Sequence, residues 1–246
     1  MNEENHKEER IAKRMARAGL CSRRDAEKWI EAGRVQLNGK VLKTPAVKVS
    51  DKDDIVVDGK AINAAPKTRL FLYHKPVGLV TSHKDEKGRA TVFDQLPAHL
   101  PRLISIGRLD LNTEGLLLLT NDGELSRYLE HPDTGWSRKY RVRVLGNVTQ
   151  ERLDKLKNGV KIDGIKYRSI DAQIEPNQSG ANKWIEITLH EGKNREIRRV
   201  MEHLNLQVNR LIRVSYGPFN LGNLPRQSVT EIKTAILKKQ VSGFFK

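Results

Sequence analysis

The sequence contains a single cysteine, Cys21, so it cannot form an intramolecular disulfide framework or a cysteine-rich zinc site. It also lacks any apolar stretch near the roughly 18 residues that a membrane-spanning helix needs. The first residues, MNEENHKEER, are polar and lack the apolar segment of a secretory signal. We therefore expect a protein of the reducing cytoplasm that does not associate with membranes.

The motifs of common cofactor-dependent and hydrolytic enzymes are also missing. The seven histidines are scattered, without an HxxxH or CxxC pair that would suggest a metal site. The segment GKNREIRR has one glycine before its lysine and does not match a phosphate-binding loop, and no G-x-S-x-G elbow occurs. We expect neither a metal nor a cofactor.

Acidic residues are outnumbered. The 246 residues include 45 Lys and Arg against 30 Asp and Glu, which gives a formal net charge of +15. The excess is uneven: residues 10–48 hold eleven basic and three acidic residues, residues 49–66 hold two and four, and residues 67–246 hold 31 and 19. Two basic regions flanking an acidic one indicate an anionic partner, but charge alone does not distinguish DNA, RNA and lipid.

Residues 1–66 are predicted to form a small helix–helix–β module with a short polar tail. The first helix is marked by apolar residues at the spacing i, i+4 and i+7, namely Ile11, Met15 and Ala18. Ser22 offers an N-cap to a second helix, with Asp25 three residues later as in a capping box. Asn38-Gly39 between short apolar runs predicts a tight β-hairpin turn.

The two helices and the turn between them would present a cluster of cations: Arg10, Arg14, Arg17, Arg23, Arg24 and Lys28. Cations on a rigid backbone can match phosphates along a folded strand, although two solvated helix faces would look similar. The segment RIAKRMARAGLCSRRDAEKWIEAGRVQLNGKVL resembles an S4 RNA-binding domain. That resemblance implies structured RNA as the partner and, by itself, no activity.

A short linker, residues 61–66, leads into a larger region over residues 67–246. Strands are expected at 69–73, 77–82, 103–106, 116–120, 140–144, 166–174, 184–190 and 208–216. Helices are expected after Asp122 and Thr149 and at 193–204 and 230–239. Because no regular βαβ repeat occurs, we predict an α+β domain built on a large, mainly antiparallel sheet flanked by helices.

Two segments of this region could carry chemistry. In GRLDLNTEGLLLLTNDG, Asp110 lies on a turn anchored by a buried strand, a rigid place for a nucleophile or base, although aspartate is also a common turn former. Arg108 could pair with Asp110 or reach a phosphate. In EGKNREIRRVMEHL, four cations gather in the predicted first turns of a helix: Lys193, Arg195, Arg198 and Arg199. Their charge opposes the helix macrodipole, which favours a role in binding an anion.

Together, the segments YHKPVGLVTS, GRLDLNTEGLLLLTNDGEL, SRKYRVRV, EGKNREIRRVM and LIRVSYGPFNLGNLP resemble the catalytic domain of pseudouridine synthases that modify ribosomal RNA. The last segment is most similar to large-subunit enzymes. The resemblance implies that Asp110 is the catalytic aspartate, that Tyr140 stacks on the target base and that Arg198 pairs with the aspartate. It also implies that Arg108 holds the target nucleotide out of its helix. Glu196 stands where many relatives have glutamine.

The implied reaction converts a uridine of 23S rRNA to pseudouridine, by cleavage of the glycosidic bond and rejoining of C5 to C1′. No atom is gained or lost, so the reaction itself requires no cofactor. The substrate could be naked RNA or a ribosome assembly intermediate, and we expect a monomer. Three alternatives stay open: the same chemistry on 16S rRNA, a non-catalytic S4-type assembly factor, and a DNA-binding regulator. The last lacks a recognition-helix pattern or a dimer heptad.

Overall fold

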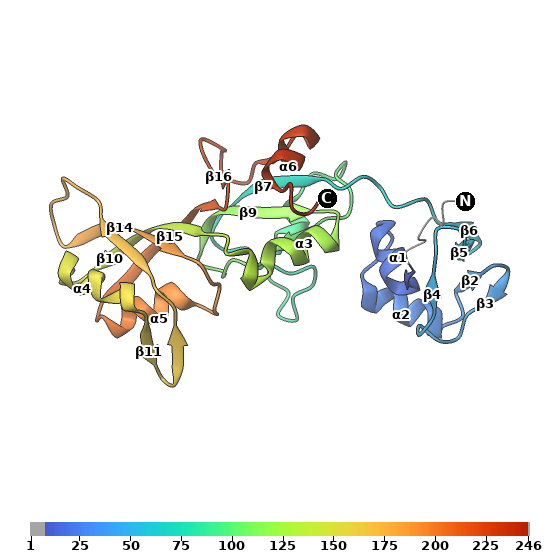
Figure 1. Cartoon of the computed structure of the whole chain (residues 1–246), viewed down its shortest axis with the longest axis horizontal. Helices are drawn as coiled ribbons and strands as arrows, with labels where there is room; N and C mark the ends of the chain where they lie inside the picture. The colour runs from blue at the N-terminus through green and yellow to red at the C-terminus, as the bar shows by residue number, and fades with distance from the viewer. Residues whose placement is uncertain (1–7, 246) are drawn as a thin grey trace. The chain divides into compact units, whose positions relative to one another are not determined.

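A computed structural model describes residues 8–245 and divides into two compact units (Figure 1). The first unit takes in the chain up to Thr68, together with residues 99–102 and 121–123. The second unit holds the rest of the chain. Within residues 8–245, no helix is both long enough and apolar enough to span a membrane.

The first unit has the predicted helix–helix–β order. Its two helices are α1 (Ile11–Arg17) and α2 (Arg23–Glu31). A four-stranded sheet has the order β3 (Lys40–Val41), β2 (Val35–Leu37), β5 (Ile55–Val57) and β6 (Lys60–Ala61). A separate pair joins β1 (Glu9–Arg10) to β4 (Lys48–Val49). Apolar side chains of both helices and the strands form one buried cluster.

Local chemistry explains where these elements begin and turn. The Ser22 hydroxyl accepts the Asp25 N–H at 3.1 Å and donates to the Asp25 carboxylate at 2.6 Å, which confirms the predicted cap of α2. Asn38 and Gly39 both have positive φ, at 50° and 77°, as a type I′ hairpin turn requires. The predicted hairpin between β2 and β3 is therefore confirmed.

The second unit is built on a nine-stranded sheet with the path β13-β14-β10-β15-β9-β7-β17, to which β8 and β16 are added at β9 and β15. Its strands are β7 (Leu70–Lys75), β8 (Ile104–Ile106), β9 (Glu114–Thr120), β10 (Arg138–Leu145), β13 (Asp171–Ile174), β14 (Asn182–Leu189), β15 (Gln207–Tyr216), β16 (Phe219–Asn220) and β17 (Val229–Glu231). Among the described residues, only the pairing of β9 with β15 in this sheet is parallel. The predicted α+β class with a mainly antiparallel sheet is confirmed.

Four α-helices and a small hairpin accompany this sheet. The helices are α3 (Gly123–Glu130), α4 (Gln150–Asp154), α5 (Glu196–His203) and α6 (Thr234–Gln240), and the hairpin is β11 (Val160–Ile162) with β12 (Ile165–Tyr167). Short 3₁₀ turns occur at Phe93–Gln95, Pro132–Thr134 and Lys155–Asn158. Thr149 occupies the N-cap position of α4 as predicted, but without a side-chain cap hydrogen bond.

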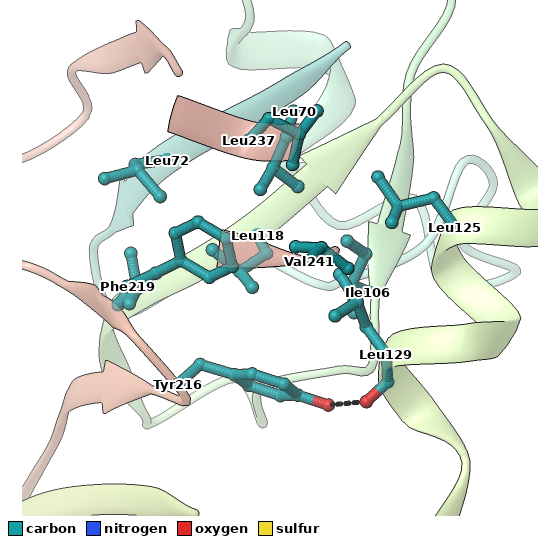
Figure 2. Packing of buried hydrophobic residues seen from close by; sticks show 11 residues of the cluster. Leu70, Leu72, Ile106, Leu118, Leu125, Leu129, Tyr216, Phe219, Leu237 and Val241 are labelled. Carbon is teal, nitrogen blue, oxygen red and sulfur yellow. Dashed lines mark hydrogen bonds between the residues drawn. The ribbon is translucent and has the colours of Figure 1, made fainter. Parts of the chain in front are cut away.

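Leucines of β9 form the centre of the core. Leu118 packs with residues of α3, β15 and α6, among them Leu129, Tyr216 and Leu237 (Figure 2). The Tyr216 hydroxyl donates to the Leu129 carbonyl at 2.8 Å, which satisfies the polar end of a buried aromatic ring (Figure 2). The predicted buried strand is confirmed, and the loop that precedes β9 is anchored to the interior.

Several predicted boundaries are wrong. Residues 77–82 form no strand, because a turn with Gly78 at φ +88° follows Pro76 and leaves only an isolated bridge at Val80. The strand expected at 166–174 is split between β12 and β13. The helix expected at 230–239 begins only at Thr234, because the preceding residues pair with β7 as β17.

Candidate active site

A cavity of about 700 Å³ opens in the second unit, where the loop before β9 meets β10, β15 and the segment that leads into α5. Six residues proposed from the sequence line it: Arg108, Asp110, Tyr140, Lys193, Arg195 and Arg198. They come from three segments far apart in the sequence, so their convergence is a result of the fold. Arg199 is exposed and does not line the cavity.

Asp110 lies on a loop that a buried lysine holds in place. The Lys75 ammonium donates to the carbonyls of Asp110 at 3.1 Å, Thr113 at 2.9 Å and Pro76 at 3.0 Å. Burial lowers the pKa of Lys75 to about 8, against the opposing charges of Asp110 and Glu114. Sequence reasoning missed Lys75, although a lysine at the end of an apolar strand was the available signal.

The loop has a second anchor in Glu114, the residue that begins β9. Its buried carboxylate accepts hydrogen bonds from the guanidinium of Arg210 at 2.5 Å and lies 3.1 Å from that of Arg226. Two cations around one buried carboxylate compensate its charge. The Asp110 loop is thus fixed on both sides, by Lys75 and by Glu114.

The ion-pair partner of Asp110 is Arg195. Their Oδ2 and Nη1 atoms lie 3.7 Å apart, and the Asp110 side chain is one-third exposed. The implied pairing of Asp110 with Arg198 is not what the described structure shows. Arg198 instead donates to the Asn112 carbonyl at 2.7 Å and to the Val208 carbonyl at 3.4 Å. Arg198 therefore contacts the backbone of the same loop rather than its carboxylate.

The later start of α5 explains this exchange of partners. The predicted helix over 193–204 begins at Glu196, so Lys193 and Arg195 precede it instead of lying in its first turns. Arg195 has a left-handed conformation, with φ 51°, at the N-cap position. Burial and the neighbouring charge of Arg195 both lower the pKa of Arg198, while the Asp110 carboxylate acts in the opposite direction.

Glu196 stabilises the turn that carries Arg195. Its carboxylate accepts the Lys193 N–H at 3.0 Å and is 3% exposed. Burial raises the pKa of Glu196 to about 7, and the nearby Glu191 carboxylate adds to this increase. Glu196 also lines the cavity, so a group that changes charge near neutral pH lies beside the candidate catalytic residues.

Tyr140 contributes an aromatic wall. It lies in β10, where buried and exposed residues alternate as predicted, and it is 9% exposed. The residue opposite Tyr140 on β15 is Arg213. Arg213 is buried and also lines the cavity, and sequence reasoning missed it. Arg108 is exposed on the cavity wall and forms no ion pair with another described residue. Its predicted pairing with Asp110 is therefore not observed.

In the first unit, a carboxylate organises the cations of α1. Glu9 lies 3.2 Å from the Lys13 ammonium, 3.4 Å from the Arg17 guanidinium and 3.8 Å from that of Arg14. Arg14 also pairs with Asp51. On α2 and at the strand before α1, four of the predicted cations are exposed: Arg10, Arg23, Arg24 and Lys28. Of the six predicted cations, Arg14 and Arg17 are thus partly neutralised and the other four are open to solvent.

The second unit therefore presents a carboxylate, an aromatic side chain and several cations around one cavity, on a chain with a separate basic module. That combination suits an enzyme acting on a polyanion. The RNA pseudouridylate synthase family model matches residues 69–203, and the S4 domain model matches residues 9–55. The chain belongs to the RNA pseudouridylate synthase family and is a pseudouridine synthase with an S4 domain. Both resemblances drawn from the sequence are confirmed.

Curated relatives and a solved structure are consistent with this family. An "uncharacterized RNA pseudouridine synthase" of Rickettsia prowazekii is 49% identical over 232 residues, which cover 94% of this chain and 97% of the relative. Ribosomal large subunit pseudouridine synthase B of Pseudomonas aeruginosa is 44% identical, over 85% of this chain and 55% of that protein. A crystal structure of a pseudouridylate synthase is 25% identical with a TM-score of 0.66, covering 94% and 99% of the two chains.

Proposed function

We propose that this enzyme isomerises a uridine of large-subunit ribosomal RNA, with Asp110 as the catalytic carboxylate. The observation that carries the proposal is that Asp110 forms an ion pair with Arg195 in a cavity that Tyr140 also lines. The large-subunit target is supported by the names of relatives in Pseudomonas aeruginosa and, at 42% identity, Yersinia pestis. The enzyme works as a monomer in the cytoplasm.

The reaction breaks the N1–C1′ bond, and the electron pair of that bond goes to the base. The base then turns so that C5 bonds to C1′, after which the C5 proton is lost and N1 gains a proton. Asp110 either attacks C1′ or removes a ribose proton. Arg195 offsets the cost of holding an ionised carboxylate beside a bound base.

The target uridine must leave its stack to reach Asp110, which costs a few kcal/mol and least in a loop or bulge. Stacking on Tyr140 returns about 1–3 kcal/mol. The exposed cations around the cavity, Arg108, Lys193 and Arg195, hold the RNA near the reacting nucleotide, and Arg199 extends this surface. Arg198 acts on the catalytic carboxylate by positioning the Asp110 loop through the Asn112 carbonyl. The S4 unit supplies further phosphate contacts through its cations, which are Arg10, Arg14, Arg17, Arg23, Arg24 and Lys28.

The Asp110→Asn variant tests the assignment. We expect it to form no pseudouridine while its dissociation constant for substrate RNA stays within about tenfold, because the amide keeps the shape but cannot act as nucleophile or base. Pseudouridine formation by this variant would refute the role of Asp110. Mapping pseudouridines in both rRNAs, from cells with and without the protein, tests the target. If a pseudouridine disappears from 16S rRNA instead of 23S rRNA, the substrate is small-subunit rRNA. If no pseudouridine disappears, a non-catalytic assembly factor is favoured.

A further inference from the structure

Arg213 is a buried cation without a counter-charge. It is 2% exposed, and its Nε donates to the Leu116 carbonyl at 2.7 Å. Its Nη2 has no hydrogen-bond partner, and no carboxylate of the described residues lies within ion-pair distance. Burying a guanidinium in this state is unfavourable, and packing alone would be served better by an apolar side chain. A partner that binds to the protein would supply what is missing.

The strand register places Arg213 beside Tyr140. The two residues are directly opposite each other on β15 and β10, and Arg138 is opposite Tyr216. Residues opposite each other project to the same face of a sheet. A register shift between Lys139 and Tyr140 lets Arg213 and Tyr216, three residues apart, share that face. Arg138, Arg213, Tyr140 and Tyr216 all line the cavity that contains Asp110.

The surroundings of Arg213 hold it rigidly. Its Cζ lies 5.3 Å from the centre of the Tyr216 ring, and the hydroxyl of that ring is fixed on the Leu129 carbonyl (Figure 2). Arg138 packs on the same ring at 4.7 Å and donates to its hydroxyl at 2.9 Å. These contacts hold the guanidinium in place, and because Nη2 is buried, an acceptor reaches it only when the cavity wall shifts to admit the ligand. A charged donor held in this way stabilises a developing negative charge.

Depth and neighbours indicate which part of the substrate Arg213 meets. Phosphates of an RNA strand would be met first by the exposed cations, Arg108, Lys193 and Arg195. Arg213 lies instead beside the aromatic wall on which, under the proposed function, the extruded base stacks. A base in that place brings the carbonyl oxygens O2 and O4 of uracil, both of which accept hydrogen bonds.

We propose that Arg213 donates from Nη2 to a carbonyl oxygen of the target uracil and stabilises the negative charge that the ring acquires as the N1–C1′ bond breaks. The electron pair of that bond is delocalised over N1, O2 and O4, and the guanidinium carries the compensating charge. This inference rests on the proposed function and adds a substrate-binding residue to it.

The test compares two bases in the same reaction. The full-length protein and its Arg213→Gln variant react under single-turnover conditions with RNA that carries uridine or 5-fluorouridine at the target. Conversion is measured as the disappearance of the target nucleoside after digestion, because 5-fluorouridine carries fluorine in place of the C5 proton and cannot yield pseudouridine itself. Arg143→Gln is the control, because Arg143 is an exposed residue of β10 that does not line the cavity.

We expect Arg213→Gln to slow the uridine reaction by about 100-fold or more. The loss should be at least tenfold smaller with 5-fluorouridine, because fluorine already stabilises the negative charge on the ring. Affinity for the RNA should change by less than threefold, and Arg143→Gln should react as the unmodified protein does. Equal losses on both bases, or a loss explained by weaker RNA binding, would overturn the proposal.

The variant Arg213→Lys covers the case in which Arg213→Gln fails to fold. Lysine keeps the charge but lacks the guanidinium fork that bonds the Leu116 carbonyl from Nε and the base from Nη2, so an intermediate loss with the same dependence on the base is expected. A loss independent of the base would count against the proposal. If the unmodified protein itself forms no pseudouridine on uridine RNA, the proposed function fails and this inference fails with it. Product from the unmodified protein, with equal losses in the variants, overturns the inference alone.

Discussion

Asp110 forms its ion pair with Arg195, whereas Arg198 donates a hydrogen bond to the Asn112 carbonyl of the same loop. The two arginines therefore act on the same loop in different ways. Arg195 is half exposed, so solvent screens its contact with Asp110, and the contact strengthens when a bound nucleotide excludes water. Arg198 makes charged hydrogen bonds to backbone carbonyls, which hold the loop whether or not RNA is bound.

Separate substitutions should distinguish these roles. Arg195→Gln is expected to lower the single-turnover rate by about 10- to 100-fold with little change in melting temperature, since it removes a charge beside Asp110. Arg198→Gln should lower both the single-turnover rate and the melting temperature, because charged hydrogen bonds contribute about 1.5–3 kcal/mol each to stability. Rate measurements and thermal melts on both variants provide the check. The alternative outcome is full activity of Arg195→Gln together with a slower rate but an unchanged melting temperature of Arg198→Gln. That outcome would mean that Arg198, and not Arg195, pairs with Asp110 when RNA is bound.

Glu196 makes stability depend on pH in a defined window. Because the pKa of Glu196 is raised to about 7 in the fold from an ordinary value of 4.5, the folded state holds this proton more tightly than the unfolded chain. Its contribution to stability is therefore complete below about pH 4.5 and is lost as pH rises toward 7. Glu196→Gln mimics the protonated form and should lose less stability than the unmodified protein between pH 5 and pH 8.

Denaturant unfolding at both pH values measures this difference. Glu191→Gln is the matched variant, because removing the neighbouring charge should lower the pKa of Glu196 and reduce the same loss. If Glu196→Gln and the unmodified protein lost equal stability over this range, the raised pKa of Glu196 would be contradicted.

Much of the fold could be predicted from residues whose local chemistry decides the structure. Ser22 with Asp25 marked the start of α2, and Asn38-Gly39 marked the hairpin, because capping and positive φ depend on a few adjacent atoms. The apolar run 116–119 marked the central strand because a short continuous apolar segment must be buried on both faces of a sheet. The prediction that Asp110, Tyr140 and Arg198 share one site came from the family resemblance, since no spacing within the sequence brings those segments together.

The parts that were missed depend on long-range register. Arg213 reaches the cavity only because of the shift between β10 and β15, and Lys75 is a loop anchor only because β7 pairs with β9. The start of α5 was placed too early because the unfavourable position of its cations on the helix macrodipole was interpreted as a sign of anion binding and not of a later start. The left-handed Arg195, which sets the true start, has no signature in an arginine side chain.

The cations of the S4 unit should differ in their contribution to RNA binding. Arg23 is exposed, whereas Arg14 is partly neutralised by Glu9 and Asp51. We expect Arg23→Gln to weaken binding and to reduce the slope of log affinity against log salt by about one, as for a lost phosphate contact. Arg14→Gln should change that slope by less. Titrations at several salt concentrations provide the comparison, and equal slopes for the two variants would contradict the division into free and neutralised cations.

Gly115 should be among the residues of the catalytic domain that least tolerate substitution. It follows Glu114 in β9 and pairs with Arg213 in the parallel β9–β15 contact, where a Cβ atom would lie 2.3 Å from the Arg213 carbonyl oxygen. Its φ of +104° adds backbone strain to that clash. We expect Gly115→Ala to separate the two strands and to destabilise the protein by more than about 2 kcal/mol, with loss of activity because the Asp110 loop leads into β9.

Gly222 provides the matched control, because it also has positive φ, at 53°, but an added Cβ would meet nothing within 4 Å. Gly222→Ala should therefore show the conformational cost alone, about 1 kcal/mol, and keep its activity. Denaturant unfolding and single-turnover rates on the two variants separate strain from steric clash. If both variants lost the same small amount of stability, the close approach of β15 to Gly115 would not be a requirement of the fold, and the rigid placement of the Asp110 loop would have to depend on Lys75 and Glu114 alone.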